Sequence, residues 1–406
     1  MKKMTSLLMA AILSACLLTG CGGGQGNTNT SSAPNSSTPA ASDKESVSNA
    51  TESTDNGGDN TASAEGQSQN EQNDGSSTEE SSAQRDYREE DAEYEVENGV
   101  IVVNQDGHYR AMELFGGSSG DTYVETLNSL RSKLDSSIRI YSVIAPLSCE
   151  FYLPANYEDY SVSQKDSIAE DINSRLDSGI TPVDVVSALG QHTSEAIYCR
   201  TDHHWMPLGA YYAAKELASA AGVDFADLST YEPVTIPGFV GTMYAFTDGD
   251  IRIKEDPEDF TYYKSSNYPN VKTDFYDTSF NYDYTGSYYK EVGDPQSNAY
   301  LTFFGGDEQI VKVRTDVKNG RKLLIVKDSY GNAVPGFLMN SFEEIYIVDM
   351  RYFNPNLVDF INQLGITDVA MTMCVFSAYG ENSKSLRDSL TQNEGQTIVD
   401  GYDPEA

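Results

Sequence analysis

The sequence predicts an α/β protein, a three-layer sandwich built around a mainly parallel β-sheet. Residues 322–374 alternate short apolar runs with helical segments, and residues 100–145 show the same alternation. Strands connected through helices in this way lie parallel in one sheet, with right-handed crossovers. The pattern changes between about 232 and 313, where Tyr, Phe, Asp, Asn and Gly dominate. We interpret this Tyr-rich segment as an insertion of short antiparallel strands and long loops that covers or flanks a site.

The C-terminal elements follow from apolar runs and their stop signals. Short apolar runs are the expected strands, at 322–327, 344–348 and 368–374. A helix is expected at 333–341, with Pro335 near its first turn, where the missing N–H does no harm. A second helix is expected at 355–364, and Gly365 ends it.

The N-terminal half of the domain follows the same rules. Strands are expected at 100–103, 138–145 and 195–199. Helices are expected at 121–134, 163–176 and 207–221, the first of them from apolar residues at helical spacing. Ser163 is a plausible N-cap and Gly222 a stop signal. The run 181–189 fits either a strand or a helix.

The N-terminus reads as an export signal followed by an anchor. Lys2 and Lys3 precede a short apolar core, Leu7 to Leu18, which cannot span a bilayer. Residues 1–20 are therefore expected to be a signal peptide, and the sequence before Cys21 resembles a bacterial lipobox. In lipoproteins with this pattern the cysteine is acylated, and two acyl chains anchor a protein stably. The alternative is an ordinary signal peptide that happens to contain a cysteine.

The next segment, residues 21–90, consists of Ser, Thr, Asn, Gly, Gln and Glu with almost no apolar side chain. Such a composition cannot offset ordering entropy, so we expect a disordered tether ahead of a folded domain at 91–406. The formal net charge of −35 argues against nucleic acid and anionic lipid head groups as partners. It suits a neutral or cationic partner, or an exported protein that is simply well solvated.

Cysteine and histidine usage points away from disulfide and metal scaffolds. The folded domain keeps three cysteines, an odd number, at Cys149, Cys199 and Cys374. Their apolar surroundings favour buried free thiols. No spacing typical of a zinc site occurs, and we expect neither a metal nor a cofactor.

The chemistry concentrates in the run Thr-Asp-His-His-Trp at 201–205. The chain has only four His and one Trp, and two of the His and the Trp lie here. Residues i and i+2 of an extended turn point to one side, so Asp202 can pair with His204 while His203 points away. A carboxylate that orients an imidazole in this way makes a general base. The nucleophile that we expect is Ser329, in the turn after the 322–327 strand.

These residues predict acyl transfer through a serine. His204 would take the proton of Ser329, Asp202 would fix the tautomer, and the Ser329 N–H with nearby donors would hold the oxyanion. Candidates for the remaining oxyanion or substrate contacts are Asn332, Gly241, Thr242, Arg200, Trp205 and Tyr330. Several of these have a structural alternative: Arg200 pairing with a carboxylate, Trp205 packing on the next helix, and Ser329 capping a helix.

The motif Asp-His-His-Trp followed by Pro-x-Gly-Ala-Tyr resembles the DHHW proteins, which are similar to the alginate O-acetyltransferases of the SGNH-hydrolase-like group. The resemblance implies an SGNH-like fold and the order Asp, His, then Ser along the chain, which Asp202, His204 and Ser329 follow. It implies O-acetylation of a cell-surface polysaccharide, with acetyl groups supplied by a membrane-bound O-acyltransferase. A lipid-anchored, extracytoplasmic location fits that division of labour. Two alternatives remain: an acetylesterase with the same triad, and a non-catalytic glycan-binding lipoprotein.

Overall fold

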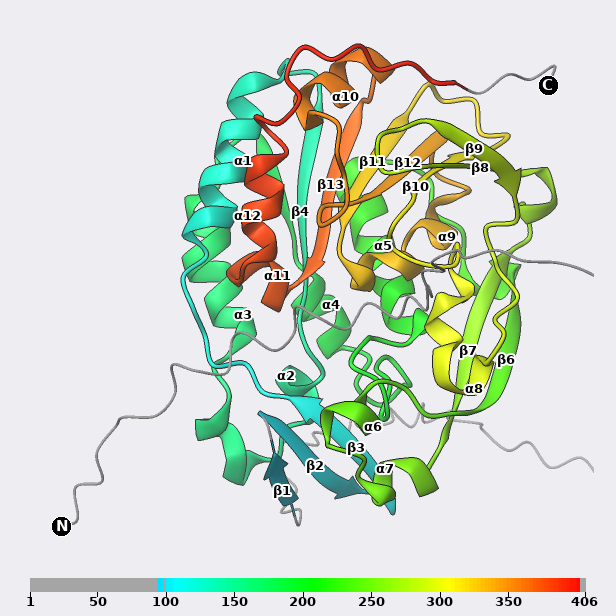
Figure 1. Ribbon diagram of the computed structural model, residues 1–406. Helices are drawn as coiled ribbons and strands as arrows, with labels where there is room; N and C mark the ends of the chain where they lie inside the picture. The colour runs from blue at the N-terminus through cyan, green and yellow to red at the C-terminus, as the bar shows by residue number, and fades with distance from the viewer. Residues whose placement is uncertain (1–93, 98, 402–406) are drawn as a thin grey trace, which may run out of the picture. The chain divides into compact units, whose positions relative to one another are not determined.

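A computed structural model describes residues 94–97 and 99–401 (Figure 1). The expected signal peptide, Cys21 and the tether lie outside these residues, so those expectations stay predictions. Among the described residues, no helix has the length and apolar character that crossing a membrane requires.

The largest sheet has eight strands in the order β5-β4-β13-β11-β12-β10-β8-β9. Its strands are β4 (Arg139–Ala145), β5 (Ile180–Val183), β8 (Lys272–Tyr276), β9 (Tyr282–Gly286), β10 (Ile310–Arg314), β11 (Lys322–Lys327), β12 (Glu344–Asp349) and β13 (Asp368–Cys374). From β5 to β12 neighbouring strands run parallel, and from β12 to β9 they run antiparallel. The fold is therefore α/β with a large mixed sheet.

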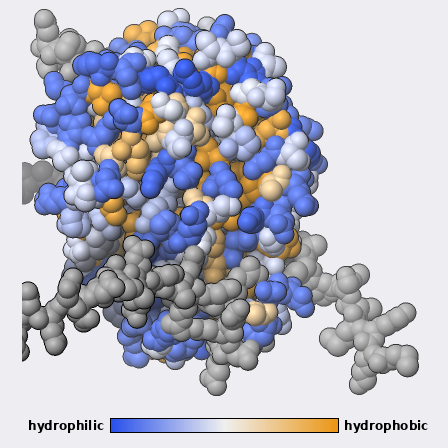
Figure 2. All heavy atoms as spheres, turned by 180° about the vertical axis from the view of Figure 1, so that it is seen from behind, coloured by the Kyte–Doolittle hydropathy of each residue, from blue (hydrophilic) through white to orange (hydrophobic). Residues whose placement is uncertain are grey.

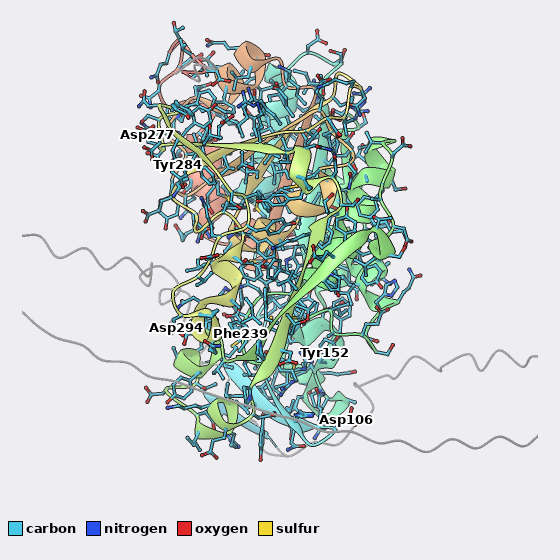
Figure 3. All side chains as sticks on the ribbon, turned by 90° about the vertical axis from the view of Figure 1, so that its right-hand side faces the viewer. Asp106, Tyr152, Phe239, Asp277, Tyr284 and Asp294 are labelled. Atoms are coloured by element: carbon cyan, nitrogen blue, oxygen red, sulfur yellow. The ribbon has the colours of Figure 1, made fainter. Side chains whose placement is uncertain are left out.

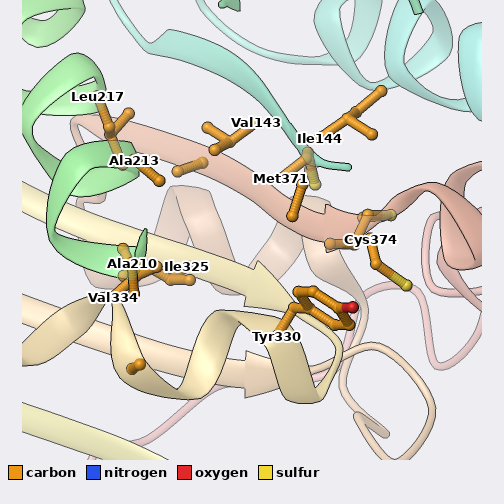
Figure 4. Close-up of a cluster of buried hydrophobic side chains, with 14 of the residues drawn as sticks. Val143, Ile144, Ala210, Ala213, Leu217, Ile325, Tyr330, Val334, Met371 and Cys374 are labelled. Carbon is orange, nitrogen blue, oxygen red and sulfur yellow. The ribbon is translucent and has the colours of Figure 1, made fainter. Parts of the chain in front are cut away.

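Helices flank strand β4 on both sides. Tyr123 of α1 (Asp121–Lys133) hydrogen-bonds Ser142 of β4, with 2.9 Å between the two hydroxyl oxygens. The next residue, Val143, lies near Ala213 of α5 (Pro207–Ala221) (Figure 4). Because successive side chains of a strand point to opposite faces, α1 and α5 cover opposite faces of the sheet at β4.

The Tyr-rich segment contributes mainly to the core. Strands β8, β9 and β10 extend the main sheet, while β6 (Tyr231–Phe239) and β7 (Glu258–Ser265) pair in a separate two-stranded sheet. In Figure 3, Asp277 and Tyr284 of this segment lie near the top of the view, and Phe239 and Asp294 lie well below them. Of its ten tyrosines, five are buried, at 262, 276, 288, 289 and 300, four are half-buried, and Tyr284 is exposed. Packing thus accounts for most of these rings.

A three-stranded antiparallel sheet precedes the main one. It consists of β1 (Tyr94–Glu97), β2 (Val100–Gln105) and β3 (His108–Glu113). The remaining α-helices are α2 (Cys149–Tyr152), α4 (Val185–Gly190), α6 (Met243–Phe246), α7 (Ile251–Glu255), α8 (Pro295–Asn298), α9 (Pro335–Leu338), α10 (Leu357–Leu364), α11 (Val375–Tyr379) and α12 (Asn382–Asp388). Short 3₁₀ turns include η2 (Ala155–Tyr160), η5 (Leu228–Thr230), η6 (Tyr268–Asn270), η7 (Ala299–Thr302) and η8 (Ser329–Ala333).

Three expected elements differ in the structure. The helix expected at 333–341 is reduced to the four-residue helix α9 (Pro335–Leu338), which follows the 3₁₀ turn η8 (Ser329–Ala333). The helix expected at 163–176 is broken into α3 (Gln164–Asp166), a π-helical stretch η3 (Ser167–Ile172) and a 3₁₀ turn η4 (Asn173–Arg175). The break accompanies a long-range contact, because Asp171 accepts the Gly120 N–H at 2.8 Å. Ser163 does cap the first piece, accepting the Asp166 N–H at 3.2 Å.

The strand expected at 195–199 does not join the sheet. Its backbone bonds go to the residues just after it: Cys199 N–H donates to the His204 carbonyl at 3.2 Å, and Met206 N–H donates to the Ile197 carbonyl at 3.0 Å. The segment therefore folds back on itself in a tight loop. The run 181–189 divides between the end of β5 and the start of α4.

The surface is predominantly polar on the face seen from behind, with hydrophobic residues scattered between hydrophilic ones (Figure 2). The exposed large hydrophobic side chains come from separate parts of the described chain: Tyr160, Val162, Ile251, Tyr284, Leu301 and Val399.

Candidate active site

The loop that carries the Asp-His-His-Trp motif is held by a buried carboxylate. Glu258, at the start of β7, accepts the backbone N–H groups of Arg200 at 2.8 Å and Thr201 at 2.7 Å, and the Thr201 hydroxyl at 2.7 Å. Burial raises the pKa of Glu258, and these donors offset part of that effect. From the sequence we expected the end of a strand to position the motif. In the structure, hydrogen bonds to the Glu258 side chain position it.

Three side chains of the site form a continuous hydrogen-bonded series. His204 Nε2 lies 2.8 Å from the Ser329 hydroxyl oxygen, and His204 Nδ1 lies 2.6 Å from Asp202 Oδ1. The His204 backbone N–H also donates to Asp202 Oδ1, at 3.0 Å. Asp202 and His204 are buried, while Ser329 is partly exposed. The structure therefore brings together all three residues that the sequence singles out for acyl transfer.

The second oxygen of Asp202 is held by Thr242. The Thr242 backbone N–H donates to Asp202 Oδ2 at 2.8 Å, and its hydroxyl donates to the same oxygen at 2.9 Å. Burial alone would raise the pKa of Asp202, but the interactions with His204 and His203 and the hydrogen bonds from His204 and Thr242 outweigh it. They hold the pKa of this carboxyl well below its usual range. Asp202 is consequently ionised and accepts hydrogen bonds only.

The turn that presents Ser329 is fixed from both sides. Asp328 accepts the Tyr330 N–H at 3.0 Å with one oxygen, and with the other it accepts the Cys374 N–H at 2.9 Å and the Ser377 hydroxyl at 2.6 Å. The indole N–H of Trp205 donates to the Tyr330 carbonyl at 2.9 Å. Trp205 thus ties the histidine loop to the serine turn.

The same turn rests on the core. The Tyr330 ring lies among buried side chains that include Met371 and Cys374, and Val334 lies beside Ala210 of α5 (Figure 4). The Tyr330 hydroxyl donates to the His203 carbonyl, a second link between the two segments. Trp205 and Tyr330 act here as packing and bridging residues.

Tyr300 forms a flat support for His204. The two rings stack with centroids 3.9 Å apart and an interplanar angle of 6°. The Tyr300 hydroxyl donates to the Tyr330 carbonyl at 3.1 Å and receives the Trp205 indole N–H at 3.1 Å. Sequence reasoning missed this residue, because nothing distinguishes it from the other tyrosines of the segment.

The alternation of side chains predicted that His203 points away from the site. That prediction was wrong, because His203 lies beside His204. Its ring centroid lies 3.8 Å from that of His204, and its Nδ1 lies 2.6 Å from the Thr242 hydroxyl oxygen. The loop is bent and not extended, so neighbouring side chains fall on the same side. Burial and the charge of His204 lower the pKa of His203 more than Asp202 and Glu113 raise it.

Several candidates for the oxyanion or the substrate are occupied by other partners. The Asn332 amide donates to Asp307 at 2.9 Å, and both donors of Thr242 serve Asp202. The Arg200 guanidinium donates to Asp256 at 2.7 Å and to the Tyr109 carbonyl at 2.8 Å. Arg200 thus pairs with a carboxylate, the alternative to a role in binding the oxyanion or the substrate. Gly241 lies against Asp202, where a side chain would not fit. The Ser329 backbone N–H is left as the oxyanion donor that we expect.

A buried group of charges lies beneath the serine turn. Lys327, the last residue of β11, binds Asp307 at 2.7 Å and Asp349 at 2.9 Å, and Arg351 binds the same two carboxylates at 2.8 and 2.7 Å. A Cβ on Gly331 would lie 2.4 Å from the Lys327 Cβ. A glycine is therefore required where the turn crosses this lysine.

Glu113, at the end of β3, is a further carboxyl group near the motif that the sequence did not reveal. Burial raises its pKa, His203 lowers it and Asp202 raises it further.

Within the described residues, Asp202, His203 and His204 have donor atoms within 4.8 Å of one another, close enough for a metal ion. Both ring nitrogens of His204 already have hydrogen-bond partners, which favours the imidazole as a base.

Fold and site together define an α/β protein with a large mixed sheet and a hydrogen-bonded Ser, His and Asp set. The family model of the DHHW proteins matches residues 71–348, and the chain belongs to this family. A DHHW family protein from Eubacterium siraeum is 46% identical with a TM-score of 0.70, over 73% of this chain and 97% of that one.

The fold is shared with a protein of much lower sequence identity. Bacillus cereus PatB1, in a structure with a sulfonyl adduct, is 15% identical with a TM-score of 0.55, over 70% of this chain and 98% of that one. The O-acetyltransferase domain of Pseudomonas putida AlgJ matches at 13% identity with a TM-score of 0.40, over 76% of this chain and 96% of that one. A comparison with curated proteins gives no match.

Proposed function

We propose that this protein is an extracytoplasmic, lipid-anchored serine acyltransferase of the SGNH-like three-layer type that O-acetylates a cell-surface polysaccharide. The observation that carries the proposal is the series Ser329, His204 and Asp202, with atoms 2.8 and 2.6 Å apart. These are the distances at which a base can take a proton from a hydroxyl and a carboxylate can orient that base. The resemblance of the Asp-His-His-Trp motif to the alginate O-acetyltransferases supports acetyl as the group transferred.

The first half-reaction forms an acetyl-enzyme. The Ser329 oxygen attacks the acetyl carbonyl of the donor while His204 Nε2 takes the hydroxyl proton, and Asp202 stabilises the imidazolium. The Ser329 N–H stabilises the oxyanion. The proton on His204 then passes to the leaving group, and the acetyl group stays on the serine oxygen. The donor that we propose is a membrane-bound O-acyltransferase that delivers acetyl groups across the membrane.

The second half-reaction returns the serine. A sugar hydroxyl attacks the acetyl carbonyl, His204 takes its proton and passes it to the Ser329 oxygen, and the acetyl ester leaves on the sugar. If water attacks in place of the sugar, the same residues give an acetylesterase. The sulfonyl adduct of PatB1 supports the proposal of an activated nucleophile in this fold, because sulfonylating reagents react with activated nucleophiles.

Hydrolysis of p-nitrophenyl acetate by the full chain tests the proposal. We expect Ser329→Ala and His204→Ala to reduce the rate by roughly 10³-fold or more, as for other triads. His108→Ala is the matched control, because His108 is 60% exposed and pairs with Asp256 outside the site. Wild-type activity in the serine and histidine variants would contradict the proposal. Acetyl esters formed on an added glycan would separate a transferase from an esterase.

A further inference from the structure

A single carboxylate organises both histidines of the motif. Asp202 Oδ1 lies 2.6 Å from His204 Nδ1, and Asp202 Oδ2 accepts the Thr242 hydroxyl at 2.9 Å. That hydroxyl oxygen in turn lies 2.6 Å from His203 Nδ1. His203 is therefore linked to Asp202 through one hydroxyl group, while His204 is linked to it directly.

The direction of these hydrogen bonds follows from the number of protons. The Thr242 hydroxyl has one proton, and it goes to the ionised Asp202, which can only accept. The Thr242 oxygen must then accept from both His203 groups near it, the backbone N–H at 3.4 Å and the ring Nδ1 at 2.6 Å. His203 Nδ1 consequently carries a proton. Because burial lowers the pKa of His203, the neutral ring leaves Nε2 as a bare acceptor.

The Nε2 atom of His203 is available to a ligand. Among the described residues it has no hydrogen-bond partner. It is also not among the buried polar atoms without a partner, so it is accessible to solvent. The side chain is 21% exposed, whereas that of His204 is 8% exposed. The two rings lie 3.8 Å apart, so the site presents two Nε2 acceptors close together, and Ser329 uses one of them.

We propose that His203 Nε2 binds the acceptor by accepting a hydrogen bond from a second hydroxyl, adjacent to the one that attacks. The inference rests on the proposed acyl transfer and narrows its acceptor to a vicinal diol, such as two neighbouring hydroxyls of a sugar ring. The attacking hydroxyl oxygen bonds to the acetyl carbon, and the bond from that carbon to the Ser329 oxygen breaks. The attacking proton goes to His204 Nε2 and then to Ser329, while His203 keeps its own proton throughout.

Two diols that differ only in hydroxyl spacing test the proposal. With p-nitrophenyl acetate as donor, the full chain should acetylate 1,2-propanediol in preference to 1,3-propanediol by roughly tenfold, the size that one hydrogen bond supports. The ratio of each ester to free acetate is measured by chromatography. Equal transfer to the two diols by the wild type would overturn the proposal.

A matched pair of variants assigns the preference to one atom. In His203→Asn the amide N–H can still donate to Thr242, but the acceptor at Nε2 is gone, so the preference for 1,2-propanediol should disappear. The ratio of the two esters is the readout, because His203 lies against His204 and its loss can also change the overall rate. In His203→Gln the amide oxygen can take the place of Nε2, and part of the preference should return. Retention of the full preference in His203→Asn would exclude this role. Circular dichroism of each variant checks that it is folded.

The tautomer has a readout that does not depend on acyl transfer. With only four histidines in the chain, single substitutions can assign every imidazole ¹⁵N resonance. We expect His203 to carry its proton on Nδ1, and 1,2-propanediol to shift the Nε2 resonance more than 1,3-propanediol does. A proton on Nε2, or equal shifts, would overturn the inference even if no acyl transfer occurs. Absence of a Ser329-dependent acetyl-enzyme, with the expected resonances present, would instead count against the proposed function alone.

Discussion

Gly241 and Asp202 lie in direct contact: a Cβ added to Gly241 would be 2.3 Å from Asp202 Oδ2 and 2.4 Å from Asp202 Cβ. No real Cβ tolerates such distances, and both atoms belong to a buried side chain that is hydrogen-bonded through both of its oxygens. The absence of a side chain at Gly241 is thus what lets the loop before α6 close over the carboxylate.

The first prediction concerns this contact. Gly241→Ala should displace Asp202 from His204 and reduce hydrolysis of p-nitrophenyl acetate by roughly 10²-fold or more, as expected for loss of the group that orients the base. The rate is measured beside that of Gly293→Ala, since a Cβ at Gly293 meets no atom within 4 Å. Comparable rates in the two variants would show that Asp202 does not need its present position.

The second prediction concerns Asp328, which fixes the serine turn. Asp328→Asn replaces a carboxylate oxygen by an amide N–H that faces other donors, either at Tyr330 or at Cys374 and Ser377. The loss of one or two buried hydrogen bonds should lower the free energy of unfolding by about 1–3 kcal/mol, measured by urea denaturation. Asp388→Asn is the control, because Asp388 is 66% exposed. Equal midpoints would contradict the prediction.

The third prediction separates the ring of Tyr300 from its hydroxyl. Tyr300→Phe keeps the stacked ring under His204 and loses the donor to the Tyr330 carbonyl, which still receives the Trp205 N–H. We expect a loss of stability of about 1 kcal/mol and little change in kcat. Tyr300→Leu removes the stacking surface, and kcat should fall because the imidazole loses its orientation. A similar kcat in both variants would rule out a role for the ring.

The fourth prediction concerns the buried charges beneath the turn. Lys327→Met leaves Asp307 and Asp349 with Arg351 alone, and it should lower the free energy of unfolding by about 3–5 kcal/mol. Lys318→Met, which removes a lysine that is 72% exposed, should have little effect. Thermal or urea unfolding measures both, and equal losses would contradict this assignment.

A fifth prediction gives the pH dependence of the same group. Burial alone would raise the pKa of Asp307, but Lys327 and Arg351 outweigh it and hold this pKa well below its usual value. A depressed pKa contributes stability above the unfolded value of about 3.9, and that contribution is lost as the pH falls through the folded value. Asp307→Asn should therefore be less stable than the wild type at pH 7, with a difference that shrinks below pH ~4. A stability difference that does not change with pH would show that the ionisation of Asp307 does not contribute to the free energy of unfolding.

Much of the fold was readable from local signals. The strands at 322–327, 344–348 and 368–374 and the helix at 207–221 were predicted to within a residue, because continuous apolar runs and Gly or Pro boundaries mark buried parallel strands and their crossovers. The loop at 195–199 was wrongly predicted as a strand. An apolar run has the same appearance whether it pairs in the main sheet or, as here, with residues just after it.

The site could be predicted only as far as residue type and spacing allow. Asp202, His204 and Ser329 were named because their types suit acyl transfer, and they lie together in the structure. The direction of His203 and the support from Tyr300 could not be predicted. Both depend on contacts between segments far apart in the sequence, which no local pattern records.

The contacts between distant segments also determine when the site can form during folding. Ser329 bonds a histidine 125 residues earlier, and the neighbouring Asp328 bonds the backbone of Cys374, 46 residues later. Contacts of such high sequence separation close late in folding, because the loop-closure entropy must be overcome first. A chain still lacking β13 has neither the Cys374 amide nor the Ser377 hydroxyl to hold the serine turn. We therefore expect Ser329, the proposed nucleophile, to reach its hydrogen-bonded geometry only in a completed domain.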